Sequence, residues 1–239
     1  MAKPDSMKLA LISDIHSNLH ALTAALREIE KHRVDALFCL GDIVGYGADP
    51  SPCVDLVRKY CRGAVLGNHD AAVAREEGIS SLPKDGQTAA RHNRRQLNDE
   101  QLEYLSNLPL TLESSSCTFV HATPRDPKDW IRFDSLRSIK AQFDYFDTAY
   151  CFVGHTHVPA IVANKLGLFK VKEGYRYIIN VGSVGQPRDE NPQLGFVIFD
   201  TDVPSHQLVR IPYDIAGAAS RIRAEGLPSS LGRRLSRGV

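Results

Sequence analysis

The sequence predicts an α/β fold in which a largely parallel sheet is followed by a second, more antiparallel sheet. Short apolar runs at residues 8–13, 36–40 and 64–66 alternate with a helical pattern at residues 19–32, which is the order of βαβ units. Toward the C-terminus, apolar and polar residues alternate, as at residues 175–181. That period of two is typical of strands with one buried face.

Periodicity also places the remaining elements. Leu19, Leu22, Leu26 and Ile29 recur at helical spacing, and a second crossover helix is expected at residues 52–60. Further strands are expected at residues 118–120, 150–153, 195–200 and 207–211. The runs at 118–120 and 150–153 are mostly apolar, which is typical of strands buried on both faces.

The length favours a single domain, residues 1–225, with two irregular segments. Residues 71–108 contain no strand-like run and end in leucines at three-residue spacing, so we expect a helical insertion. Residues 123–146 are expected to form a lid segment that helps to shape a pocket. Residues 226–239 are rich in Gly, Ser and Arg, and we expect a flexible basic tail there.

Composition limits the classes of function. The 239 residues carry a formal net charge of +1, which gives no broad field for nucleic acid or for an anionic membrane. The apolar run at residues 9–12 is too short for a signal peptide or a membrane span, so we expect a cytoplasmic protein. The five cysteines show no CxxC spacing, which argues against a zinc knuckle.

Metal-capable side chains follow five successive strand-like runs. They are Asp14 and His16, Asp42, Asn68, His121, and the pair His155 and His157. Taken singly, an aspartate before a helix is more often a cap and a histidine at a strand end is more often a structural residue. Ligands of α/β sheets bind at the carboxyl ends of strands, however, and independent accidents would not align so regularly.

Seven candidate ligands are too many for one tetrahedral ion, whereas two ions that share a carboxylate would use them all. Imidazole, carboxylate and amide ligands without a thiolate suit Mn, Fe, Co, Ni or Zn. The sequence therefore predicts a site for two divalent metal ions.

The ordered motifs DxH, GDxxG, GNHD, an isolated histidine after a strand, and GHTH resemble those of the calcineurin-like metallophosphoesterase superfamily. Three segments, residues 41–47, 66–70 and 180–188, resemble its small bacterial and archaeal phosphodiesterase-like branch. The resemblance implies a four-layer αββα sandwich of two mixed sheets flanked by helices. It also implies Mn, Fe or Zn as the metals.

Carried over by position, the resemblance assigns Asp14, His16 and His157 to the first metal. Asn68, His121 and His155 would hold the second metal, and Asp42 would bridge the two. His69 is then unligated and catalytic. The implied activity is hydrolysis of a small phosphodiester or nucleotide-type substrate by a metal-activated hydroxide.

The chain departs from the protein serine/threonine phosphatases of this superfamily. Gly45 and Tyr46 replace the Asp and Arg of their GDxVDRG motif, and Leu66 replaces the Arg before GNH. Protein phosphatase activity is thus disfavoured, and the orienting partner of His69 is open. Ser17 stands where close relatives usually show glycine.

Asn18, Tyr46 and Arg188 are candidates for substrate contact, although a structural role is an equal alternative for each. Two other functions stay open: a catalytically silent metal-binding scaffold for protein interactions, and a nuclease. The low net charge makes nucleic acid a less favoured partner than a small phosphoester. The sequence allows a homo-oligomer.

Overall fold

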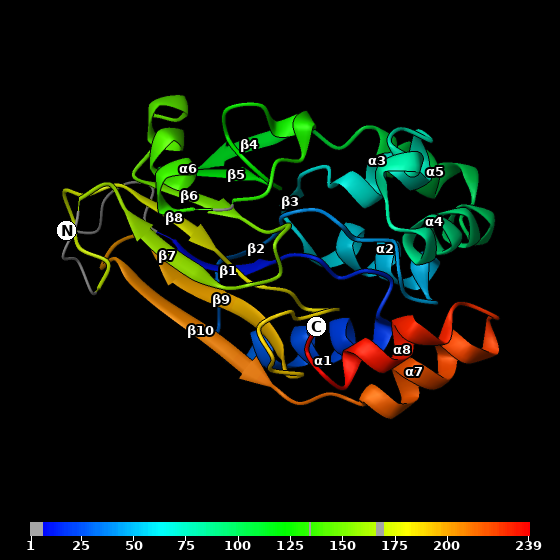
Figure 1. The fold of residues 1–239 in the computed structure, drawn as a ribbon. Coiled ribbons are helices and arrows are strands. Elements are labelled where there is room, and N and C mark those ends of the chain that lie inside the picture. Colours follow the sequence, from blue (N-terminus) through cyan, green and yellow to red (C-terminus); the bar gives the residue numbers. More distant parts are fainter. Residues whose placement is uncertain (1–6, 134, 166–169) are drawn as a thin grey trace.

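The computed structural model describes residues 7–133, 135–165 and 170–239 (Figure 1). The strands are β1 (Lys8–Ile12), β2 (Ala36–Cys39), β3 (Gly63–Ala64), β4 (Thr111–Ser114), β5 (Cys117–Val120), β6 (Tyr150–Val153), β7 (Ala160–Ala163), β8 (Tyr177–Asn180), β9 (Leu194–Asp200) and β10 (Ser205–Ile211). The α-helices are α1 (Leu19–Lys31), α2 (Pro50–Tyr60), α3 (Asn68–Ala74), α4 (Lys84–Gln96), α5 (Asp99–Ser106), α6 (Leu136–Lys140), α7 (Ile215–Ala224) and α8 (Ser229–Leu235). Short 3₁₀ turns are η1 (Ile79–Ser81), η2 (Pro127–Asp129) and η3 (Ala141–Tyr145).

The strands form two mixed sheets of five strands each. The order in the first sheet is β10-β9-β1-β2-β3, and the order in the second is β4-β5-β6-β8-β7. In the first sheet β1 and β2 are parallel, with Leu9 opposite Ala36, whereas β9 runs antiparallel to β1. In the second sheet β5, β6 and β8 are parallel, and the edge strands β4 and β7 are antiparallel to their neighbours.

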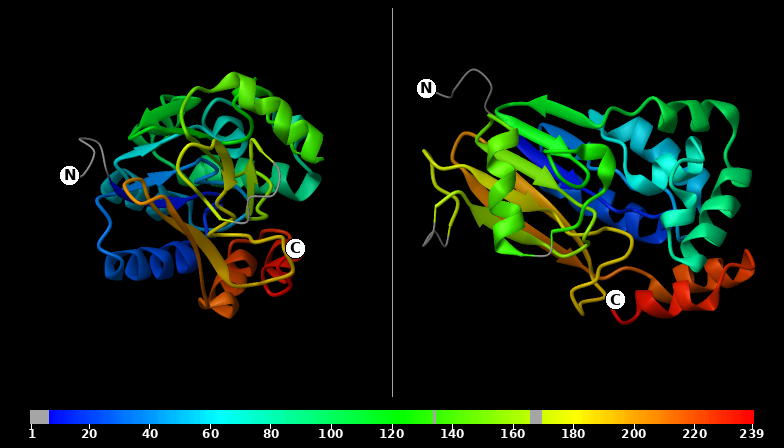
Figure 2. Two further views of the ribbon diagram at one scale, coloured as in Figure 1. Left: turned by 90° about the vertical axis from the view of Figure 1, so that its left-hand side faces the viewer. Right: turned by 45° about the horizontal axis from the view of Figure 1, so that its top comes forward.

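Alternate side chains of β1 show how the layers pack. Leu9 and Leu11 belong to the apolar cluster between the two sheets, in which the rings of Phe38 and Phe119 stack at 4.5 Å between centroids. The intervening Ala10 instead joins the cluster under α1 and α2. Both faces are buried, which explains why these strands are continuously apolar. The expected α/β class with two mixed sheets flanked by helices is confirmed (Figure 2).

The division of strands between the sheets differs from the expectation. All five expected early strands are present, but β5 and β6 lie in the second sheet, while β9 and β10 extend the first sheet beside β1. Alternation of apolar and polar residues indicates that one face of a strand is buried. It does not indicate which sheet the strand joins. β4 and β7, which the sequence did not indicate, are short edge strands whose side chains are half-buried or exposed.

Two segments without expected strands add helices outside the two sheets. Residues 71–108, expected as a helical insertion, hold most of α3 together with η1, α4 and α5. Residues 123–146, expected as a lid, contain η2, α6 and η3, and residue 134 lies outside the described residues. Phe143 and Phe146 of the second segment pack on the outer face of the second sheet.

The prediction of a flexible C-terminal tail is wrong. Residues 226–239 are not a flexible tail, because they form α8, which packs against α7 (Figure 1). Leu227, Leu231 and Leu235 are buried in a cluster that also includes Ile222 and Tyr46. The three leucines are four residues apart and form one apolar stripe. The composition of the segment does not reveal this stripe, because Gly, Ser and Arg residues surround the leucines. None of the helices in the described part of the chain is both long and apolar enough to cross a membrane.

Replacing Leu231 by alanine tests this packing. Leu231 is fully buried, so Leu231→Ala is expected to lower the free energy of unfolding by about 2–5 kcal/mol. Urea denaturation measures the change. The control is Arg233→Ala on the exposed face of α8, which should stay within about 0.5 kcal/mol of the unmodified chain. Equal small effects from both changes would contradict a packed α8.

Candidate metal centre

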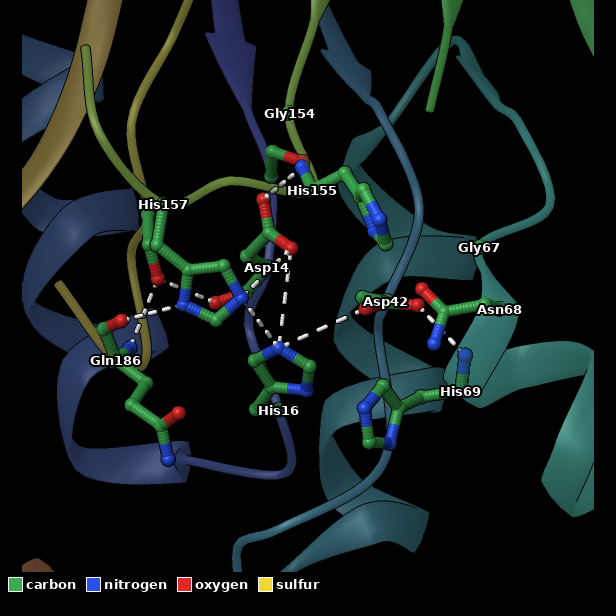
Figure 3. A network of polar contacts seen from close by, with 12 residues as sticks. Asp14, His16, Asp42, Gly67, Asn68, His69, Gly154, His155, His157 and Gln186 are labelled. Atoms are coloured by element: carbon green, nitrogen blue, oxygen red, sulfur yellow. Dashed lines mark hydrogen bonds and ion pairs between the residues drawn. The ribbon is translucent and has the colours of Figure 1, made fainter. Parts of the chain in front are cut away.

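The seven candidate ligands follow five strands and lie on loops, except for Asn68, which begins α3. Figure 3 shows all of them but His121. Asp14 and His16 follow β1, Asp42 follows β2, Asn68 follows β3, His121 follows β5, and His155 and His157 follow β6. Six of them are buried and Asn68 is half-buried. The first four come from the first sheet and the last three from the second. The site thus lies where the carboxyl ends of the two sheets meet.

The backbone turns sharply at most of these positions. Asp14, His16, Asp42, His155 and His157 have φ angles between 50° and 65°, in the left-handed region that few residues other than glycine occupy. Backbone hydrogen bonds fix the first two turns, because Asp14 N donates to Gly41 O (3.0 Å) and His16 N donates to Asp42 O (2.9 Å). Unfavourable conformations persist only where the surroundings impose them, and they concentrate at functional sites.

Asp14, His16 and His157 form one group of converging atoms. Asp14 Oδ1 lies 3.2 Å from His157 Nε2 and 3.7 Å from His16 Nε2. The two imidazole Nε2 atoms lie 3.1 Å apart. All three atoms are close enough for a single ion to bind them together.

A second group forms around Asp42, His121 and His155. His121 Nε2 lies 3.4 Å from Asp42 Oδ2, 3.2 Å from His155 Nδ1 and 3.3 Å from Asn68 Oδ1. Asp42 Oδ2 also lies 3.6 Å from His16 Nε2. The Asp42 carboxylate therefore stands between the two groups.

Hydrogen bonds to backbone carbonyls determine the tautomer of three histidines. The Nδ1 atoms lie 3.1 Å from Val44 O in His16, 2.7 Å from Leu40 O in His121 and 2.5 Å from Gln186 O in His157. A carbonyl only accepts, so each Nδ1 carries the proton, and in a neutral ring Nε2 is left with its lone pair. These lone pairs face one another and the carboxylates, which is the arrangement that a cation satisfies.

Unpartnered atoms support the same interpretation. Asp14 Oδ1 and His155 Nε2 are buried and have no hydrogen-bond partner among the described residues. Buried polar atoms without a partner are rare and call for a specific explanation, such as an ion. The residues present therefore fit divalent metal ions.

Burial and neighbouring charges give the site its protonation pattern. Burial lowers the pKa of His155 to about 3, so that ring is neutral at pH 7. Burial alone would raise the pKa of Asp42, but His121 and His69 hold it well below its usual range. Burial would lower the pKa of His121, yet Asp42 raises it to about 9. A metal ion beside Asp42 would compete with that proton for the His121 lone pair.

His69 lies beside the two groups, with its ring close enough to His16 and Asp42 for these three to bind an ion as well. Its backbone N donates to Asp42 Oδ1 (2.8 Å), and its ring lies 4.4 Å from the Tyr46 ring between centroids. Burial lowers the pKa of His69 to about 4. Among the described residues none hydrogen-bonds to the ring, and the buried Nδ1 has no partner. A side chain at Gly45 (φ 96°) would collide with that ring, so glycine is required where protein phosphatases have aspartate.

The three candidate substrate contacts have different surroundings. Asn18 caps α1, and its amide is fully used: Oδ1 accepts from Ala21 N (3.1 Å) and Nδ2 donates to Gly185 O (2.8 Å). These hydrogen bonds give Asn18 the structural role that the sequence left open, and a substrate contact by this residue stays a prediction. Tyr46 lines a cleft beside the site. The half-buried Arg188 donates from Nη2 to Gln186 Oε1 (2.8 Å), and it has no ion pair with a carboxylate within the described ranges.

Asn93 is a buried residue of the site that the sequence did not indicate. Its Oδ1 accepts from Ser17 Oγ (2.7 Å) and from Gly45 N (2.6 Å), and its Nδ2 donates to Gly47 O (2.9 Å). It thereby ties α4 to the loops after β1 and β2, and it explains the serine at position 17. A lone asparagine within a helical segment gives no signal of this role.

Asp70 was likewise not assigned a role. Its two carboxylate oxygens accept from Val44 N (3.1 Å) and Gly67 N (3.0 Å), and so it holds the loops after β2 and β3 together. Its position directly after His69 in the GNHD motif is a signal that would have allowed the assignment.

A two-sheet α/β fold with groups of histidine and aspartate at the strand ends is the architecture of a metallophosphoesterase. The family described as the calcineurin-like phosphoesterase superfamily domain matches residues 7–203 of this chain. The chain therefore belongs to the calcineurin-like phosphoesterase superfamily. This confirms the resemblance seen in its motifs.

Relatives from bacteria and archaea extend the match to nearly the whole chain. An uncharacterized protein from Methanocaldococcus jannaschii is 38% identical to this chain. The match covers 95% of this chain and 96% of that protein. The crystal structure of a metallophosphoesterase from Sphaerobacter thermophilus has a TM-score of 0.85 and 39% identity, with 98% of this chain and all of that chain covered. A hypothetical protein from Pyrococcus horikoshii shares the fold, with a TM-score of 0.78, 22% identity and coverage of 97% and 98% of the two chains.

Replacing Asn93 by alanine is expected to destabilise the site loops. The change leaves the buried Ser17 hydroxyl and Gly45 N–H without an acceptor, at a cost of about 1–3 kcal/mol in the free energy of unfolding. Urea denaturation gives this value. Arg95→Ala, at an exposed position of the same helix, is the control and should be nearly neutral. Stability unchanged in Asn93→Ala would show that the three hydrogen bonds do not hold the loops.

Proposed function

We propose that this chain is a hydrolase that cleaves phosphoester bonds with the help of two divalent metal ions. One observation carries the proposal: two groups of carboxylate and imidazole side chains converge on either side of the Asp42 carboxylate, and the atoms of each group are close enough to bind one ion. Membership of the superfamily supports the same reaction class.

The two groups suggest a division of the ligands. Asp14, His16 and His157 would hold one ion, and Asn68, His121 and His155 would hold the other. Asp42 would bridge them, in keeping with its distances to His16 and His121. Such ions, when bound, supply an activated water nucleophile and neutralise charge on the phosphoryl oxygens. The donor set suits Mn, Fe or Zn, with Co or Ni as further candidates.

His69 and Arg188 would act on the substrate. The His69 ring is next to Asp42 but is not needed to complete either proposed ligand set, and its buried Nδ1 lacks a partner. Its neutral ring would donate a hydrogen bond to the leaving oxygen, a contribution of about 10²- to 10⁴-fold. The Arg188 guanidinium has no carboxylate partner among the described residues, and it would bind a phosphoryl oxygen.

Substitutions at His69 and Asp42 separate catalysis from metal binding. His69→Ala is expected to keep both metal ions and to lose about 10²- to 10⁴-fold in turnover, whereas Asp42→Ala is expected to lose metal as well. Elemental analysis and hydrolysis of bis(p-nitrophenyl) phosphate with added Mn²⁺ measure the two effects. His20→Ala, at a partly exposed histidine of α1, is the control. Full turnover in His69→Ala would remove that residue from the mechanism.

Removing the Arg188 guanidinium is expected to lower kcat/KM for the phosphoester substrate without a loss of bound metal. A charge-assisted hydrogen bond to phosphate is worth about 1.5–3 kcal/mol, so Arg188→Ala should lower kcat/KM on the order of 10- to 100-fold. Arg188→Lys should recover part of the loss, because the positive charge is kept. Arg237→Ala, at an exposed position, is the control. If kcat/KM is unchanged in Arg188→Ala, the residue does not contact the phosphoryl group.

A further inference from the structure

A cleft of about 400 Å³ opens beside Asn68, His69 and His155. Leu82 and Pro83, which precede α4, form an apolar part of its lining. Its size lies within the range of sites for small organic ligands. A phosphoester held at the metal centre would therefore have room for a substituent of limited size in this cleft.

Trp130 gives the cleft an aromatic surface. It is the single tryptophan of the chain, lies directly after η2, is half-buried and lines the cleft. Its ring centroid lies 5.9 Å from that of the candidate ligand His121. Its φ of 52° lies in the left-handed region, which is rare for a bulky residue and needs a compensating role.

Charges around the cleft indicate a small anionic ligand and disfavour a polymer. Arg132 also lines the cleft, and it forms no ion pair within the described ranges. The exposed carboxylates of Glu77 and Asp129 lie in the same lining. A nucleic acid strand would bring several phosphates close to these carboxylates, whereas a single phosphoester would place its one phosphate at the metal centre.

We infer that the cleft is a subsite for a planar aromatic group attached to the scissile phosphoester, with Trp130 as the stacking surface. A nucleobase is a planar aromatic group that is joined to a phosphoester through a ribose, so the substrate class is a small nucleoside phosphoester. Stacking between a base and an aromatic side chain is worth about 5- to 150-fold in affinity for each base. The inference depends on the proposed function for the identity of the bond that is cleaved.

Matched substrates test the subsite. Hydrolysis of 2′,3′-cyclic AMP and of glycerophosphocholine, a diester without an aromatic group, is compared in the presence of Mn²⁺. Trp130→Ala is expected to lower kcat/KM for the cyclic nucleotide by about 5- to 150-fold and to leave the aromatic-free diester unchanged. Trp130→Phe should retain most of the nucleotide activity. Tyr60→Ala, which removes an exposed aromatic ring of α2 outside the cleft, is the control.

The outcomes separate this inference from the proposed function. The aromatic subsite is overturned if the protein shows metal-dependent turnover and Trp130→Ala lowers it equally for both diesters or does not lower it at all. Either result would leave the proposed phosphoesterase activity intact. Absence of turnover with every diester would count against the phosphoesterase itself.

A binding measurement then decides on the subsite independently of turnover. The fluorescence of the single tryptophan is followed while AMP or ribose 5-phosphate is added to the Mn²⁺-loaded protein. Quenching by AMP at concentrations at which ribose 5-phosphate has no effect supports stacking on Trp130. An equal response to the two ligands, or none, overturns it.

Discussion

The close packing of loop backbones at the carboxyl ends of β1, β2 and β3 is the constraint on which the site depends. A side chain at Gly67 would collide with the Asp42 carboxylate, so the loop after β3 can lie directly against the loop after β2 only if glycine is there. The left-handed turns at Asp14 and Asp42 direct both carboxylates into the same small volume. Asn93 and Asp70 then hold these loops together through buried hydrogen bonds.

This packing has an electrostatic cost that also gives the site its affinity for cations. His16 Nε2 and His157 Nε2 lie 3.1 Å apart, and the carbonyl partners of their Nδ1 atoms keep both lone pairs directed inward. Burial keeps water from separating these atoms, so their repulsion is stronger than it would be in solvent. A cation removes the repulsion and binds to the same atoms, so the features that weaken the metal-free fold are those that favour metal binding.

Short-range patterns made much of the fold predictable, and long-range contacts account for what was missed. The first five expected strands are present, and the residues that follow them converge. Both could be predicted because the end of a strand and the polar residues after it can be recognised from neighbouring residues in the sequence. The partition of strands between sheets depends on which faces meet, so β9 was misplaced. Asn93 lacks any local signal, and the buried stripe of Leu231 and Leu235 was obscured by the arginines between them.

The two sheets contribute ligands to each proposed ion, and this has a mechanical consequence. Asp14 comes from the first sheet and His157 from the second, 141 residues farther along the chain than His16. Ions bound between them would act as cross-links between layers that are also joined by apolar contacts such as the Phe38 and Phe119 stack. Separating the layers would then require breaking coordination bonds at one end of the interface. Under load or brief thermal opening, the metal-bound protein would part from the opposite end of the sandwich first.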